Sequence, residues 1–280
     1  MFLQNKIEPM EEAVKKGNYT VAFFDILGFK EMVNTMPLDK LVEKYEYIFI
    51  EVANSLNFHY SPESKELSFF PHHPLGKPFC IKYIFSDSIM LFSNESSAES
   101  CLKLLIYSWK LFQTLLAFGF PARGAITRGE VYVNNVQKIF LGKALTAAYE
   151  LAEKQQWIGA CIDTTIFNEF PELSELIKSE NYVLRDLFFE YDVPIKDESC
   201  IRMHTLNWRW NLIVEKGTRS LFPQSVLKDV TVKQNNSLEY AKQFVSTGRI
   251  YMQNQDKIPV ELRAMWVGAK EPPFKHGDEL

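Results

Sequence analysis

The sequence predicts an α+β fold in which an antiparallel-rich sheet carries helices on one face. Short apolar segments of strand length alternate with longer segments in which apolar residues recur at helical spacing. Several strand segments follow each other closely, and such pairs must be antiparallel hairpins, because a parallel connection needs a dozen or more residues. The resulting order, β-α-β-β-α-β-β-α-β, is that of a ferredoxin-like sheet.

The first predicted strand covers residues 21–24, and residues 37–57 predict a helix because apolar side chains recur every three or four positions. Residues 58–78 contain too many prolines for a core element and are expected to form an inserted loop. His72 and His73 belong to this loop. Adjacent histidines converge poorly on one ion, so we expect no metal site there.

Residues 81–92 predict two strands that meet at a tight Ser-Asp-Ser turn. A long helix is expected at residues 96–118, ended by Gly119 and Pro121. Residues 122–133 are then expected to form two strands, residues 142–156 a helix, and residues 158–162 a further strand.

Residues 1–165 are expected to form one domain, and residues 166–280 a C-terminal extension that packs on its core. In the extension, strands are expected near residues 182–191 and 201–210, and a helix at 237–250.

Composition excludes several classes of protein. Of the 280 residues, 46% are hydrophobic, enough for a large core. The net charge is -4 and the basic residues are scattered, which argues against a nucleic-acid partner. No stretch approaches the roughly 18 consecutive apolar residues of a membrane span, and the first residues lack a signal peptide's apolar region, so we expect a cytoplasmic protein. The four cysteines are widely spaced, which indicates reduced, buried thiols rather than zinc ligands or disulfides.

Two aspartates, Asp25 and Asp87, lie at the ends of apolar strand segments. Two carboxylates repel each other when bare, and divalent cations between them turn this repulsion into attraction. The pattern predicts a two-metal site for Mg²⁺ or Mn²⁺ that acts on phosphate. The alternative is a pair of ordinary turn aspartates, since Asp is common in turns.

Four motifs in series resemble those of class III nucleotidyl cyclases, the adenylate and guanylate cyclase superfamily, over residues 21 to about 163. They are Phe-Asp-Ile-Leu-Gly-Phe at 24–29, Ile-Phe-Ser-Asp-Ser-Ile-Met at 84–90, Ala-Arg-Gly-Ala-Ile-Thr-Arg-Gly-Glu-Val at 122–131 and Phe-Leu-Gly-Lys-Ala-Leu-Thr-Ala-Ala-Tyr-Glu-Leu at 140–151. The resemblance implies a homodimer whose sites form between two copies.

The resemblance also implies roles for single residues. Asp25, Asp87 and the backbone carbonyl of Ile26 would hold two Mn²⁺ or Mg²⁺ ions. The segment that contains Phe24, Gly28 and Phe29 would bind substrate, with backbone N–H groups at residues 27–29 cradling the β- and γ-phosphates.

The sequence departs from the superfamily at the positions that recognise the purine base. In the resemblance, Tyr83 and Ile139 stand where the superfamily has a lysine and an aspartate that recognise adenine. The replacement removes a donor and acceptor pair and fills space, which favours a pyrimidine. Alternatively, Tyr83 is an ordinary half-buried strand tyrosine.

The fourth motif departs as well, because Thr146 and Glu150 stand where the family has an asparagine and an arginine. Cationic help must then come from elsewhere, and Arg123, Arg128 and Lys143 are the candidates, with Arg123 taken as catalytic. Arg123 could equally pair with a buried acid, and Arg128 could be a solvated turn charge.

Together with residues 191–196 and 207–208, the pattern resembles the pyrimidine cyclases of bacterial Pycsar antiphage defence systems. The resemblance implies conversion of UTP to cyclic UMP, which a separate effector protein would sense. Alternatives are a cytidylate cyclase that converts CTP to cyclic CMP, a catalytically silent nucleotide-binding regulator, and an interaction scaffold without a nucleotide site.

Overall fold

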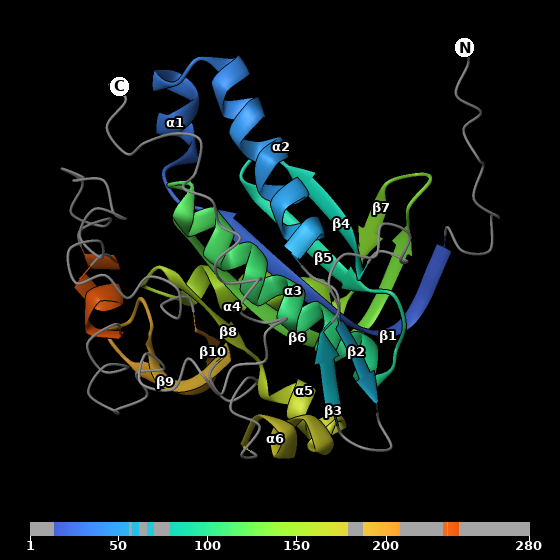
Figure 1. Cartoon of the computed structure of the whole chain (residues 1–280). Coiled ribbons are helices and arrows are strands. Elements are labelled where there is room, and N and C mark those ends of the chain that lie inside the picture. Colours follow the sequence, from blue (N-terminus) through green and yellow to red (C-terminus); the bar gives the residue numbers. More distant parts are fainter. Residues whose placement is uncertain are drawn as a thin grey trace, which may run out of the picture.

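The computed structural model describes residues 14–55, 58–61, 66–69, 79–178, 187–207, 232–233 and 235–240 (Figure 1). Within these ranges an eight-stranded sheet runs in the order β4-β5-β1-β6-β8-β10-β9, with β7 paired to β6. Its strands are β1 (Val14–Ile26), β4 (Cys80–Phe85), β5 (Ser88–Ser93), β6 (Ala122–Asn134), β7 (Ile139–Leu141), β8 (Gly159–Ile162), β9 (Phe188–Pro194) and β10 (Cys200–Leu206). The helices are α1 (Phe29–Thr35), α2 (Leu38–Ser55), α3 (Ala98–Ala117), α4 (Lys143–Lys154), α5 (Thr164–Glu169) and α6 (Pro171–Lys178).

Two crossovers define the topology. The chain leaves β1, passes through α1 and α2, and returns as β4, with β5 lying between β1 and β4 in the sheet. It then leaves β5, passes through α3 and returns as β6 on the far side of β1. Neighbours in the series β4-β5-β1-β6 are all antiparallel. The predicted α+β class and the ferredoxin-like strand order are confirmed.

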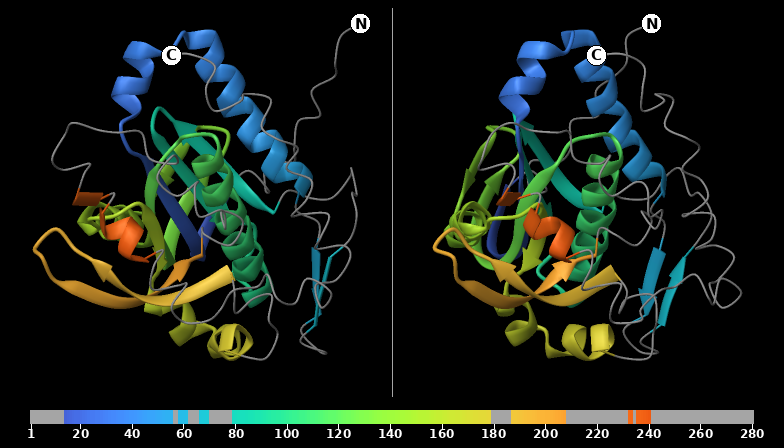
Figure 2. Two further views of the ribbon diagram at one scale, coloured as in Figure 1. Left: turned by 60° about the vertical axis from the view of Figure 1, so that its left-hand side comes forward. Right: turned by 90° about the vertical axis from the view of Figure 1, so that its left-hand side faces the viewer.

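Consecutive phenylalanines of β1 point to opposite faces of the sheet. The ring of Phe24 lies 6.1 Å from that of Phe112 on α3, whereas the ring of Phe23 lies 5.4 Å from that of Tyr149 on α4. Helices α3 and α4 therefore cover opposite faces, as Figure 2 shows. The expectation that the helices lie on one face is wrong for α4. Strand side chains alternate, and residues 21–24 are apolar on both sides, so each face needs a cover.

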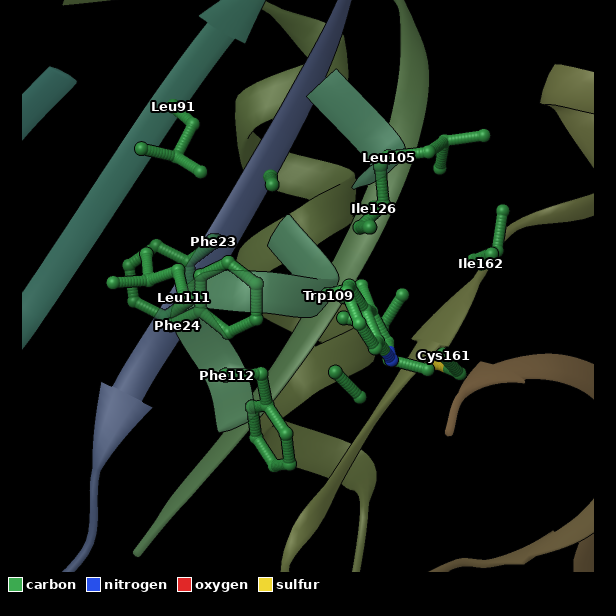
Figure 3. Close-up of a cluster of buried hydrophobic side chains, with 14 of the residues drawn as sticks. Phe23, Phe24, Leu91, Leu105, Trp109, Leu111, Phe112, Ile126, Cys161 and Ile162 are labelled. Carbon is green, nitrogen blue, oxygen red and sulfur yellow. The ribbon is translucent and has the colours of Figure 1, made fainter. Parts of the chain in front are cut away.

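Helix α3 forms the centre of the core. Its buried side chains lie among those of β1, β5, β6 and β8 (Figure 3). The Ser97 side chain caps the helix by accepting from the Ser100 N–H, and Gly119, with a φ of 81°, ends it. These local signals explain why the predicted boundaries of this helix are close to the observed ones.

The prediction of two strands at residues 122–133 is wrong, because β6 is continuous. It pairs with β1 from Ile26↔Ala122 to Val14↔Asn134 without interruption. A partner of equal length satisfies the backbone groups around Gly129 in an extended conformation, so the glycine does not produce a turn.

Residues 58–78, expected as an inserted loop, include the strands β2 (Phe58–Ser61) and β3 (Glu66–Phe69), which form a separate two-stranded sheet. His72 and His73 lie outside the described residues.

The region after residue 165 adds two strands to the main sheet, because β10 pairs with β8 and β9 with β10. Residues 235–240 are helical, and the Ser237 hydroxyl accepts from the Ile158 N–H at 2.7 Å. The Trp109 indole of α3 donates to the Asn207 carbonyl at 2.9 Å. These later segments therefore pack against α3 and β8.

Three of the four cysteines are buried free thiols, as expected, and burial raises the pKa of Cys80 to about 12. Cys200 is exposed. It is the first residue of β10, next to the connection between β9 and β10. Among the helices in the described ranges, none combines the length and apolar character needed to cross a membrane.

Candidate active site

Asp25 and Asp87 lie next to each other at one edge of the sheet. Asp25 is the penultimate residue of β1 and pairs with Ser88, the first residue of β5. The Ile26 N–H donates to the Asp87 carbonyl at 2.9 Å. The predicted convergence of the two aspartates is therefore present in the backbone, and the Asp87 carboxylate is close enough to raise the pKa of Asp25.

The turn that carries Asp87 is tight and unusual. Phe85 pairs with Ser88, so Ser86 and Asp87 form a two-residue hairpin turn. Ser86 has a φ of 55°, in the left-handed region, at the first turn position. A positive φ at this position is the feature of a type II′ turn, which prefers glycine there. The Tyr45 hydroxyl of α2 donates to the Ser86 carbonyl at 3.2 Å.

The Asp25 carboxyl group is partly buried. Burial raises its pKa above the ordinary 3.8, the neighbouring Arg123 opposes this rise, and the charge of Asp87 adds to it. Two neighbouring carboxylates, one of which burial makes harder to ionise, form a place where a further cation is electrostatically favoured.

Arg123 lies directly opposite Asp25 on β6 and is buried. Its Nε donates to Asp25 Oδ2 at 3.0 Å, and its Nη2 lies 2.9 Å from the same oxygen as an ion pair. Nη2 also pairs with the Glu153 carboxylate of α4, and Nη1 donates to the Glu153 carbonyl at 3.3 Å. The alternative raised from the sequence, pairing of Arg123 with an acid, is observed, and two acids share the guanidinium.

The carboxylate oxygens of Asp25 and Asp87 fit a divalent cation whose remaining ligands come from other groups. Both contacts of Asp25 with Arg123 use Oδ2, which leaves Oδ1 without a hydrogen bond within the described ranges. No group of three or more His, Cys, Asp or Glu side chains that could hold a metal occurs among the described residues. Mg²⁺ is commonly held by one or two carboxylates plus substrate phosphates and water, and Asp25 and Asp87 provide such a pair.

The segment after Asp25 supplies part of the expected phosphate cradle. Gly28 precedes α1 with a φ of 75°, and an added Cβ would meet nothing within 4 Å, so conformation rather than space calls for glycine. The Leu27 N–H already donates to the Pro121 carbonyl at 2.7 Å. If residues 27–29 bind phosphate, the donors come from Gly28 and Phe29.

Tyr83 lies on the same face of the sheet as Asp25. It pairs with Met90, which in turn pairs with Phe23 two residues before Asp25. The Tyr83 ring lies 3.9 Å from the Phe140 ring of β7, centroid to centroid. Helix α4 covers this same face, and Thr146 is exposed on that helix. Tyr83 and Thr146 therefore both lie on the side of the sheet that carries Asp25.

Other candidate residues lie outside this arrangement. The Phe24 side chain is fully buried against α3, so only its backbone is near the site. Arg128 pairs with Thr20, five residues from Asp25 along β1, about 17 Å away. It pairs with Glu169 at 2.7 Å and lies over the Phe170 ring, so it is a buried structural charge and not a solvated one. Lys143 is exposed at the start of α4, at the opposite end from Glu153.

Sequence reasoning missed three residues of this region: Tyr45, Glu153 and Lys233. Lys233 is buried, and its charge is near enough to oppose the rise in the pKa of Asp25. None of the three belongs to a local motif, so no signal in the sequence alone points to them.

Solved structures with similarity to this chain include several nucleotidyl cyclases. The catalytic core of a rhodopsin-guanylyl cyclase with converted specificity, in complex with ATPαS, is 11% identical with a TM-score of 0.46, and the match covers 69% of this chain and 97% of that one. A bacterial light-regulated adenylyl cyclase is 10% identical with a TM-score of 0.42, over 79% and 99% of the two chains. The adenylyl cyclase CyaB from P. aeruginosa is 12% identical with a TM-score of 0.40, over 69% and 95%.

No protein-family model and no curated protein matches the sequence. The chemistry of this chain is therefore inferred from its own side chains.

Proposed function

We propose that this chain is a pyrimidine nucleotide cyclase that converts UTP to 3′,5′-cyclic UMP and pyrophosphate by two-metal catalysis. The proposal is carried by the adjacency of Asp25 and Asp87, joined through the hydrogen bond from the Ile26 N–H to the Asp87 carbonyl. The resemblance of residues 24–29 and 84–90 to cyclase motifs supports a nucleoside triphosphate as the substrate.

In this proposal, Asp25, Asp87 and the Ile26 carbonyl hold two Mn²⁺ or Mg²⁺ ions. Such ions, when bound, neutralise phosphate charge and lower the pKa of the ribose 3′-hydroxyl. The 3′-oxygen forms a bond to the α-phosphorus, the bond from that phosphorus to the pyrophosphate oxygen breaks, and the hydroxyl proton passes to water. Arg123 acts on Asp25, because its contacts hold Oδ2 and leave Oδ1 for a cation.

The preference for a pyrimidine rests on Tyr83. Its ring contacts Phe140 and has the Lys138 amine 5.2 Å from its centroid, so this part of the face is filled by side chains. A filled pocket favours a smaller base, with UTP as the primary candidate and CTP as the alternative.

We further propose a homodimer with two equivalent sites. Among the described residues, the cation in direct contact with Asp25 is Arg123, which two carboxylates already share. A second copy would add charge and the exposed surface of α4, which includes Thr146. By resemblance to the Pycsar cyclases, the product would be a second messenger in antiphage defence, sensed by a separate effector.

The function is tested by incubating the purified protein with Mn²⁺ and each of the four NTPs, and identifying products by mass spectrometry. We expect cyclic UMP from UTP. Cyclic CMP alone would support the cytidylate alternative, and a purine product would contradict the role of Tyr83. Light scattering that shows an active monomer would contradict the homodimer.

A second candidate is a catalytically silent nucleotide-binding regulator. The exposed Glu150, in the helix position where the family resemblance expects an arginine, favours it. Binding of an NTP, detected as a rise in melting temperature, together with no cyclic product from any of the four nucleotides, would identify this function.

A further inference from the structure

Tyr45 of α2 contacts both segments that carry the acidic residues of the site. Its hydroxyl donates to the Ser86 carbonyl, directly before Asp87, at 3.2 Å. Its ring lies 5.9 Å from the ring of Phe29, the first residue of the helix that follows Asp25. One side chain therefore bridges the start of α1, which follows Asp25, and the β4–β5 turn.

The Tyr45 ring is itself held in place. It contacts Phe49 on the same helix at 6.1 Å and the buried Phe120 at 5.3 Å, both centroid to centroid and edge-on. A ring fixed by several aromatic neighbours keeps its hydroxyl in one position. Burial and the charge of Asp87 also raise the pKa of Tyr45 above its ordinary range, so the hydroxyl keeps its proton.

The turn needs such a contact because of its conformation. Ser86 adopts a φ of 55°, which non-glycine residues rarely adopt. Besides the pairing of β4 with β5, two hydrogen bonds from other segments hold the turn, since the Ser86 carbonyl accepts from Tyr45 and the Asp87 carbonyl accepts from the Ile26 N–H. Loss of the first bond leaves the residue before Asp87 free to relax toward a commoner conformation.

We propose that Tyr45 is a positioning residue that fixes the turn of Asp87 relative to Asp25, and so sets the affinity of the site for divalent cations. The inference rests on the proposed function, because it requires that the two aspartates bind a metal. It assigns no contact between Tyr45 and the substrate.

The test is Tyr45→Phe, which keeps the ring contacts and removes only the hydroxyl. Mn²⁺ binding to the protein without nucleotide is measured from the electron paramagnetic resonance signal of free Mn²⁺. We expect the dissociation constant to rise by about three- to tenfold, the effect of one lost hydrogen bond. In the cyclase assay, the Mn²⁺ concentration for half-maximal rate should rise, with kcat at saturating Mn²⁺ changed less than about twofold.

The matched control is Tyr47→Phe, on the same helix, where the ring lies 5.2 Å from that of Phe118 and the hydroxyl makes no hydrogen bond to the turn among the described residues. It should bind Mn²⁺ as the wild type does. In a Ser86→Gly background, where the positive φ carries no penalty, Tyr45→Phe should have a smaller effect. Wild-type binding of Mn²⁺ with equal binding by Tyr45→Phe overturns the role of Tyr45 alone. No Mn²⁺ binding by the wild type overturns the metal site and this inference with it.

Discussion

Arg123 and Asp25 face each other on neighbouring strands, and two nitrogens of the guanidinium lie within 3.0 Å of the single oxygen Oδ2 of the carboxylate. The same guanidinium pairs with Glu153, which in turn lies 3.4 Å from the Lys196 amine. A chain of alternating charges thus links the end of β1 to α4 and to the β9–β10 connection. Arg123 orients the Asp25 carboxylate, and its positive charge is already shared between Asp25 and Glu153 when no phosphate is bound.

Replacement of Arg123 by Met should destabilise the fold. The side chain is buried, and its removal leaves Asp25 and Glu153 without the cation that they share. We expect the free energy of unfolding to fall by about 3 kcal/mol, as for other broken buried ion pairs. Urea unfolding followed by circular dichroism measures it.

The control for Arg123→Met is Arg202→Met, because Arg202 pairs with Asp192 on the exposed side of the β9–β10 hairpin. Loss of this pair should cost about 0–1 kcal/mol. Equal losses in the two variants would contradict a structural role for the Arg123 ion pairs.

Asp25→Asn and Asp87→Asn should each abolish cyclic nucleotide formation while the fold persists. Each change keeps the shape of the side chain and removes the charge that a divalent cation needs. Product formation with saturating Mn²⁺ should fall by at least about a hundredfold. Asp192→Asn, in the exposed hairpin pair, serves as the control and should leave the rate unchanged. Near-normal turnover by either site variant would rule out the two-carboxylate mechanism.

The raised pKa of Asp25 predicts how stability changes with pH. Between 3.8 and the raised pKa, the folded protein binds a proton at Asp25 that the unfolded chain does not, so this residue makes folding more favourable as the pH falls. The free energy of unfolding of the wild type minus that of Asp25→Asn should therefore rise on acidification from pH 6 toward pH 4. Urea titrations at several pH values provide both numbers.

Asp197 gives the opposite sign and is the internal control for the pH experiment. Hydrogen bonds from Ser199 lower its pKa, so its contribution to stability is present above 3.8 and is lost as the pH falls through the lowered value. The wild type minus Asp197→Asn difference should fall on acidification. The same slope for both residues would show that burial does not dominate the pKa of Asp25.

Tyr83→Ala should weaken discrimination against purines. The change removes the ring that contacts Phe140 and opens space beside β4. We expect the ratio of kcat/KM for UTP over ATP to fall about tenfold, the usual size of a pocket-filling effect. Lys82→Ala, one residue earlier and near the Phe49 ring on the other face, should leave the ratio unchanged. An unchanged ratio in Tyr83→Ala would mean that this tyrosine only packs the strand.

Local patterns in the sequence predicted much of the architecture. The helices α2, α3 and α4 follow from apolar periodicity, and their ends follow from nearby capping and breaking residues, all of which act over a few positions. Predictions that needed a distant partner did less well. Residues 122–133 are predicted to form two strands, yet β6 is one strand that β1 pairs with along its whole length. The prediction that all helices lie on one face of the sheet was also wrong, because α4 lies on the face opposite α3. Apolar periodicity shows that a helix has an apolar face, but it does not show which surface that face packs against.

By itself, the sequence determined the strand order and placed Asp25 and Asp87 at strand ends, since both depend on short-range chemistry and on the limits that short connections place on strand pairing. Only the tertiary structure decided what surrounds them. Glu153 reaches Arg123 across 30 positions, and Tyr45 reaches Ser86 across 41. Contacts of this kind arise when whole helices dock on the sheet, and their free energy depends on neighbours that no local window of residues contains.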